Sequence, residues 1–216
     1  MNMTRRAVLS FAFMQVGWFA CVLGAARGYP WLGPAVVFFG LAIHVRTQPR
    51  GARVKEVLIL ALAAVLGFAV DTALLRCGVM SVAGAAVSPA WLVALWPTLG
   101  AATARGGSLG SLERRPIVGV LLGALGGPFA YDAGARLGAI GLAESRLGAL
   151  AIIGAAWSLV LPTLFCLRRR IAQGKGRQPR EPETRSKEGP CTIETSASMN
   201  RLDRDSSRAS RSPRAC

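Results

Sequence analysis

Apolar residues form six long stretches along the chain, and short polar segments separate them. The stretches cover residues 7–26, 29–45, 57–75, 89–104, 116–140 and 147–167. Most of them approach the roughly 20 residues that a helix needs to cross the hydrocarbon core of a bilayer. The pattern therefore predicts an all-α fold, a polytopic membrane helix bundle with about six transmembrane helices.

Positive charges between the stretches alternate between many and few, which bears on orientation in a membrane. The cation-rich segments hold Arg5 and Arg6, then Arg46, Arg50, Arg53 and Lys55, then Arg105, Arg114 and Arg115, whereas the intervening segments hold only Arg27, Arg76 or Arg146. Loops rich in Lys and Arg stay on the cytoplasmic side of a membrane. Both termini are therefore predicted to be cytoplasmic.

Residues 1–167 and residues 168–216 both contribute to the formal net charge of +15. Residues 1–167 hold 13 Lys and Arg against five acids, and residues 168–216 hold 13 against six. In the first part the surplus lies mainly in predicted cytoplasmic loops, where it orients insertion. We therefore expect the lipid bilayer as a partner and expect no nucleic acid.

The composition changes after residue 167 and suggests a domain boundary. Residues 168–216 lack apolar periodicity and are rich in Arg, Ser, Pro, Gly and Glu. Such a composition buries too little apolar surface to offset the entropy of ordering. We predict a transmembrane helical domain at 1–167 and a basic, disordered cytoplasmic tail at 168–216. Attraction of anionic headgroups and a stop-transfer flank are both open as roles of the tail.

Small residues form a stripe along the fifth stretch. Gly119, Gly123 and Gly127 repeat every four residues, and Gly134 and Gly138 continue the stripe after a step of three at Ala130. Small residues at this spacing let a second helix backbone approach closely within a membrane. The stripe predicts tight helix packing, which we expect to be intramolecular, and it leaves the oligomeric state open.

Charged residues inside two predicted helices mark a candidate site. A charged side chain in hydrocarbon costs about 2.5–3.5 kcal/mol on insertion scales, so such groups usually pair or face a wet cavity. Asp71 and Asp132 fall at similar estimated depths in the outer half of the bilayer. We predict one outward-facing polar cluster that binds a small polar solute or a lipid headgroup. Its members are Asp71, Arg76, Tyr131, Asp132 and Arg136. An interfacial structural pair of Asp132 with Arg136 is the alternative.

Signs of catalytic or metal chemistry are weak. His44 is the only histidine, lies near the cytoplasmic end of the second stretch and has no carboxylate or nucleophile as a sequence neighbour, so we interpret it as structural. The chain has no Gly-x-Ser-x-Gly, His-Glu-x-x-His or Cys-x-x-Cys pattern. We predict no catalytic residue, no metal site and no cofactor. Residues 79–88 fit an outer loop or a re-entrant turn.

Several motifs resemble a known family. They are residues 15–24 (QVGWFACVLG), 67–71 (GFAVD), 91–96 (WLVALW) and 123–128 (GALGGP), followed by Tyr131, Gly134 and Gly138. Together they look like the bacterial membrane family catalogued as domain of unknown function 2878, over roughly residues 7–167. The resemblance implies a small multi-pass protein of the bacterial cytoplasmic (inner) membrane with no assigned activity.

The sequence thus leaves function open between three classes. The favoured interpretation is a small transporter or a solute- or lipid-binding membrane module that uses the outward-facing cluster. A membrane enzyme acting on a lipid or lipid-linked substrate is an alternative, although no catalytic pattern supports it. An assembly partner of a membrane complex is the third class.

Overall fold

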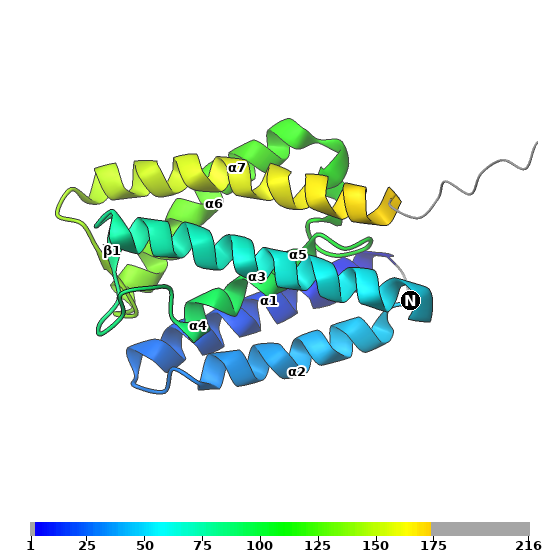
Figure 1. Ribbon diagram of the computed structural model, residues 1–216, viewed down its shortest axis with the longest axis horizontal. Coiled ribbons are helices and arrows are strands. Elements are labelled where there is room, and N and C mark those ends of the chain that lie inside the picture. Colours follow the sequence, from blue (N-terminus) through cyan, green and yellow to red (C-terminus); the bar gives the residue numbers. More distant parts are fainter. Residues whose placement is uncertain (1–2, 174–216) are drawn as a thin grey trace, which may run out of the picture. The chain divides into compact units, whose positions relative to one another are not determined.

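The computed structural model describes residues 3–173, with the side chain of Arg114 left out, and it is all-α as predicted. The elements in chain order are α1 (Met3–Ala26), α2 (Leu32–Thr47), η1 (Arg50–Ala52), α3 (Arg53–Arg76), β1 (Met80–Ser81), α4 (Ala90–Val93), α5 (Leu95–Ala102), η2 (Gly110–Arg114), α6 (Pro116–Arg136), β2 (Gly141–Leu142) and α7 (Arg146–Gln173). Figure 1 shows α2, α3 and α7 nearly parallel to one another, with α4 and α5 enclosed between the longer helices.

Four segments are long and apolar enough to cross a membrane by length and composition: α1, η1 with α3, α6 and α7. The remaining apolar helices, α2 and the α4–α5 segment, are shorter. The outer faces of the long helices carry large apolar side chains such as Phe11, Val65 and Phe129, which are exposed in the isolated chain. Exposed apolar area of this extent marks a surface that contacts lipid or protein. Six crossings with cytoplasmic termini stay a prediction.

The fourth apolar stretch forms two short helices instead of one, and Pro97 explains the break. Proline has no backbone N–H, so the carbonyl oxygen of Val93, four residues earlier, loses its helical partner. The helix is interrupted at Ala94, between α4 and α5. Irregular backbone at membrane depth is tolerated where protein surrounds it. The segment meets this condition, since α5 packs on α1, α2 and α3 and buries Trp96 and Thr98.

Two helices that run in the same direction end in the same way. Gly78 after α3 and Gly138 after α6 adopt positive φ angles of 68° and 83°. In each turn two backbone N–H groups donate to the last carbonyl oxygens of the helix, for example Ala139 N to Gly134 O at 3.0 Å. This is the Schellman arrangement, which favours glycine because of its left-handed backbone. The fifth predicted stretch therefore ends as a helix at Arg136, not at residue 140, and Gly138 lies outside it.

Residues 79–88, left open between a loop and a re-entrant turn, form a connection at the end of α3. β1 pairs in antiparallel register with β2, with Met80 opposite Leu142 and Ser81 opposite Gly141. The pairing joins the α3–α4 connection to the α6–α7 connection. Met80 is 2 % exposed, so this short ladder closes the core at its end.

The most extensive helix contact is that of α6 with α7, and glycines make the approach close. A Cβ atom at Gly123 would overlap the backbone oxygen of Trp157, and one at Gly127 would overlap the Trp157 side chain. From the other side, a Cβ atom at Gly154 would lie 2.8 Å from the carbonyl oxygen of Ala124. Gly119 and Gly134 have more space, with nearest atoms at 3.7 and 3.9 Å. The tight contact is thus intramolecular and centred on Gly123 and Gly127.

α7 continues to Gln173, past the predicted domain boundary at residue 167, so the first residues of the predicted tail are helical. The division into a membrane domain and a tail stays a prediction. The last turns of α7 are helical since Arg168 packs back into the bundle and Arg169 pairs with Glu113. The disorder predicted for the rest of the tail concerns residues 174–216, which lie outside the described part of the chain.

Candidate functional site

A buried carboxylate lies where three helices meet. Asp71 of α3 is 0 % exposed. Its Oδ2 atom accepts a hydrogen bond of 2.8 Å from the indole Nε1 of Trp96 on α5. Its Oδ1 atom accepts a short hydrogen bond from the hydroxyl of Tyr131 on α6. Among the described residues no cation pairs with Asp71, so two neutral donors satisfy this carboxylate.

Aromatic rings surround these donors. The indole of Trp157 on α7 stacks on Trp96 at a centroid distance of 5.0 Å, and its ring meets the Tyr131 ring edge to face at 6.1 Å. Such offset and edge-to-face pairs add packing energy and fix ring orientation. The aromatic cluster of Trp96, Tyr131 and Trp157 is therefore held rigidly, and Asp71 anchors two of its three members.

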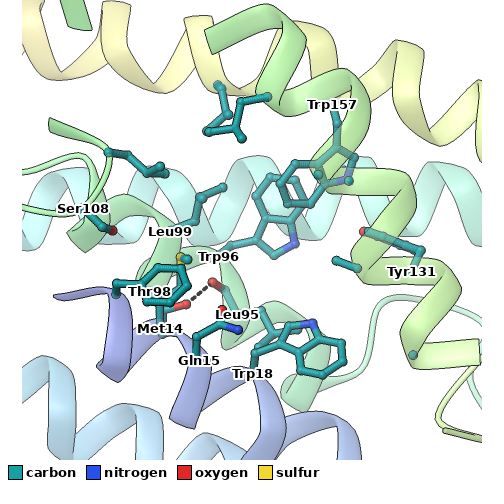
Figure 2. Close-up of a pocket in the computed structure, with 18 of the residues that line it drawn as sticks. Met14, Gln15, Trp18, Leu95, Trp96, Thr98, Leu99, Ser108, Tyr131 and Trp157 are labelled. Atoms are coloured by element: carbon teal, nitrogen blue, oxygen red, sulfur yellow. Dashed lines mark hydrogen bonds between the residues drawn. The ribbon is translucent and has the colours of Figure 1, made fainter. Parts of the chain in front are cut away.

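A cavity of about 520 Å³ lies in front of the aromatic cluster (Figure 2). This volume is within the roughly 300–1,000 Å³ typical of small-molecule pockets. The lining comes from α1, α4, α5, α6, α7 and the connection before α6, and it is mostly apolar. Four of the five tryptophans of the chain contribute to it: Trp18, Trp91, Trp96 and Trp157.

The long walls of the cavity are α1 and α6. On α1 the lining runs from Phe11 to Val22, and on α6 from Leu122 to Gly134. At 1.5 Å per residue these distances are about 17 and 18 Å. α6 packs on α7 and makes no comparable contact with α1. Phe11 is 52 % exposed and Leu122 is 41 % exposed, although both line the cavity, so the cavity opens between these two helices.

Few polar groups reach the cavity, and three of them lack a hydrogen bond to any described residue. The Trp157 Nε1 and Ser108 Oγ atoms are buried without a partner. The amide of Gln15 on α1 points into the same space (Figure 2). A polar group that is buried without a partner is costly, so Ser108 Oγ is a candidate hydrogen-bonding position for a bound molecule. Trp157 Nε1 lies beside the Tyr131 hydroxyl, and the half-buried Gln15 amide is a second candidate position.

The structure divides the five predicted site residues among three sets of partners. Tyr131 joins Asp71, as described. Asp132 instead accepts bonds of 2.7 Å from Arg136 and from Arg146 of α7, all on an exposed surface. Successive residues of a helix point about 100° apart, so Tyr131 and the adjacent Asp132 face different directions. In the described part of the chain, no hydrogen bond or ion pair joins Asp132 or Arg136 to Asp71.

Arg76, the fifth member, lies at the exposed end of α3. Its Nε atom donates to the backbone oxygen of Ala86 at 3.3 Å. The contact holds the β1–α4 connection against the end of α3. Among the described residues, Arg76 therefore forms no hydrogen bond or ion pair with either aspartate.

A second buried carboxylate, Glu56, lies at the opposite end of α3 and was missed by sequence reasoning. The guanidinium of Arg168 on α7 binds both of its oxygens, at 2.8 and 3.1 Å. The Nε2 atom of His44 on α2 lies 2.9 Å from Glu56 Oε1. His44 therefore has a carboxylate neighbour in space that its sequence neighbours did not indicate, because the α2–α3 turn brings the two helices together.

Arg168 completes this latch, which we define as Glu56, Arg168, His44 and Thr103. Its Nε atom donates to Thr103 Oγ1 at 2.9 Å, and a terminal nitrogen donates to the Gly100 backbone oxygen at 2.8 Å. α2, α3, α5 and α7 are thus tied together at one end. In the described part of the chain, no group of three or more His, Cys, Asp and Glu side chains is arranged to hold a metal ion.

One signal for the aromatic cluster is present in the sequence as a repeated spacing. Gly67, Asp71, Arg76 and Gly78 recur as Gly127, Tyr131, Arg136 and Gly138, sixty residues later. Each first glycine has the same structural role. A Cβ atom at Gly67 would overlap the Trp96 ring, as one at Gly127 would overlap Trp157. The spacing thus marks the helix positions that receive a tryptophan and a polar partner.

Comparison with known proteins gives a family and no function. No curated protein and no solved structure matches the chain. Residues 7–163, well over half of the 216 residues, match one family of uncharacterised proteins. The chain therefore belongs to the family described as protein of unknown function (DUF2878).

Proposed function

We propose that this protein is a lipid-binding module of the bacterial inner membrane, whose cavity holds a long apolar chain. The observation that carries the proposal is the cavity of about 520 Å³ between α1 and α6, lined mainly by apolar and aromatic side chains. The other classes considered from sequence, a transporter of small polar solutes, an enzyme and an assembly partner, find no comparable support.

The position of the cavity mouth supports an occupant that arrives from lipid. Exposed apolar side chains flank the mouth on both walls, among them Val8 and Phe11 on α1 and Leu122 and Leu125 on α6. A water-borne polar solute would have to cross this apolar rim. The walls extend about 17–18 Å, which exceeds the roughly 15 Å of one leaflet's hydrocarbon. An extended acyl or isoprenoid chain matches such a space.

Asp71 serves the cavity indirectly in this proposal. The carboxylate is buried behind the rings and binds Trp96 and Tyr131, whose other faces line the cavity. It therefore fixes the shape of the wall and does not contact the occupant. The Gln15 amide remains as a donor along the wall for a polar atom of the bound lipid.

The proposed orientation has six crossings and both termini in the cytoplasm, so that the latch lies on the cytoplasmic side. Support comes from the alternation of basic segments and from the four long apolar helices. Phosphatase fusions after residue 110 and after residue 173 are expected to be inactive, whereas fusions after residue 28 are expected to be active. Activity after residue 110 would contradict the topology.

Gly126 offers a direct test of the cavity. It lines the cavity, and a Cβ atom at this position would meet nothing within 4 Å. Gly126→Leu should fill the space without displacing a neighbour. The purified protein is titrated with phospholipids that carry brominated acyl chains, which quench tryptophan fluorescence on contact. We expect strong quenching for the parent and a loss of most of it for Gly126→Leu.

Gly51→Leu is the matched control, because it makes the same chemical change at an open position outside the cavity. It should quench like the parent. Equal quenching of the parent and Gly126→Leu, with both folded by circular dichroism, would show that brominated chains contact the protein elsewhere. The cavity would then not be the lipid site.

A further inference from the structure

We infer that the occupant of the cavity is an anionic phospholipid, whose phosphate group lies at the end formed by residues 103–112 and whose chain extends toward Trp18 and Tyr131. The inference rests on the proposed lipid-binding function and adds the class and orientation of the lipid.

The connection between α5 and η2 closes this end of the cavity and presents hydroxyl groups to it. Ser108 and Ser111 both line the cavity, and Ser108 Oγ is buried without a hydrogen-bond partner. The connection folds tightly onto α5: Leu109 N donates to Ala102 O at 2.9 Å. Glycine at position 107 is required there, because a Cβ atom would overlap the Ala102 oxygen. The backbone therefore holds Ser108 in place as an unused donor.

Three arginines belong to the segments that form the same end, although none of them lines the cavity. Arg6 of α1 lies against the connection, since its Cδ atom is 3.4 Å from the position of a Cβ atom on Gly106. Arg105 precedes this glycine, and Arg115 follows η2. None of these three arginines forms an ion pair with a described residue. The nearby acid, Glu113, pairs instead with Arg169 at 3.3 Å.

The charges near the opposite end of the cavity are paired. The lining there ends at Gly134 and Ile140. The nearby Asp132 binds both Arg136 and Arg146, so these two arginines share one acid. An anionic headgroup is therefore attracted more strongly to the end that combines an unpartnered hydroxyl with Arg6, Arg105 and Arg115, which orients the lipid. A cation near an anionic lipid surface contributes about 1 kcal/mol, equivalent to roughly a fivefold change in affinity.

The test compares phosphatidylglycerol with phosphatidylcholine, both with the same brominated chains, in the tryptophan quenching titration of the full-length protein in detergent. We expect phosphatidylglycerol to reach half-maximal quenching at a concentration at least about fivefold lower. The double variant Arg6→Gln with Arg105→Gln should raise that concentration to the phosphatidylcholine value and leave phosphatidylcholine unchanged. Arg6→Lys with Arg105→Lys should keep the preference, because the charge is retained.

Arg46→Gln with Arg50→Gln is the control, since it removes two exposed cations from another basic segment outside the cavity. It should keep the preference for phosphatidylglycerol. An equal loss in this control would mean that only overall surface charge matters, which would overturn the inference. Inorganic phosphate at millimolar concentration should not reverse the quenching. Reversal would assign the end of the cavity to a free anion and overturn the lipid assignment.

Two failures are distinguishable in this design. Equal quenching by the two lipids, still sensitive to Gly126→Leu, would refute the anionic preference and leave the lipid-binding cavity supported. Absence of quenching by either lipid would refute the proposed function itself.

Discussion

Two carboxylates on α3 are both buried, yet they are satisfied in opposite ways. Glu56, 5 % exposed, meets a guanidinium that binds both of its oxygens. Asp71, 0 % exposed, meets an indole N–H and a phenol hydroxyl. At the Glu56 end the charge is compensated within the latch. At the Asp71 end the described residues supply hydrogen bonds without a counter-charge.

This difference indicates that Glu56 has a structural role, whereas Asp71 positions residues that line the cavity. The latch uses both oxygens of Glu56 and the three nitrogens of Arg168, so it has little capacity left for a ligand. Trp96 and Tyr131 each use their polar atom to donate to Asp71, and both residues also line the cavity. Removal of one partner of a buried ion pair strongly destabilises the folded protein, because the other charge stays buried without compensation. The two ends should therefore respond very differently to mutation.

The largest effect is expected for Arg168→Leu, which leaves Glu56 buried without its cation. Loss of one partner of a buried pair costs about 3–5 kcal/mol. The thermal unfolding midpoint in detergent should fall strongly. Arg169→Leu is the neighbouring control: its pair with Glu113 is exposed, so its removal should cost less than about 1 kcal/mol. Similar midpoints for the two variants would refute the role of the latch.

A compensating substitution sharpens the same test. Glu56→Leu combined with Arg168→Leu removes both charges and leaves no uncompensated ion, which is often close to neutral. We expect the double variant to recover more than half of the loss caused by Arg168→Leu. A double variant as unstable as Arg168→Leu would mean that Arg168 acts through Thr103 and Gly100 and not through Glu56.

Tyr131→Phe should have an intermediate effect. It removes one of the two donors to Asp71 while the bond from Trp96 remains. Hydrogen bonds to charged groups contribute about 1.5–3 kcal/mol. The unfolding midpoint should therefore fall by less than in Arg168→Leu, and quenching by brominated chains should persist because the ring still lines the cavity. A variant with unchanged stability would show that the Tyr131 hydroxyl does not stabilise Asp71.

The smallest effect is expected for Asp71→Asn. The amide oxygen still accepts from Trp96, and the amide nitrogen donates to the Tyr131 oxygen after the hydroxyl rotates. No charge is left unpaired, and the hydrogen of the Tyr131 hydroxyl is the donor that loses its acceptor, so the cost should be about 1 kcal/mol, at the low end of the range for one unpaired neutral donor. A loss as large as that of Arg168→Leu would mean that a cation compensates Asp71, and the contrast between the two ends would fail.

Features that lie within a single helix were predicted well from the sequence. Features that form only where several helices meet were not. The apolar stretches predicted the all-α class, and the stripe at Gly123 and Gly127 lies in the most extensive helix contact, that of α6 with α7. Glu56 and Arg168 are separated by 112 residues, and no local spacing relates them. The cavity was also beyond prediction, because it depends on how side chains from five helices fill space around Gly126.

Of the α6 residues predicted to share a site with Asp71, Tyr131 contacts it, and the reason is geometric. Position along a helix axis placed Asp71 and Asp132 at similar heights but ignored rotation about the axis. Tyr131, one residue earlier than Asp132, is the side chain of α6 that faces Asp71. Rotation of about 100° per residue decides which of two neighbours enters a site.

The repeated spacing around Gly67 and Gly127 has a consequence for how the α3–α5 and α6–α7 segments meet. Corresponding residues contact each other: Asp71 binds Tyr131, and the tryptophans that cover the two glycines, Trp96 and Trp157, stack. A substitution at one of these positions therefore also changes the surroundings of its counterpart, and the acid on one segment and the phenol on the other make the two segments unequal.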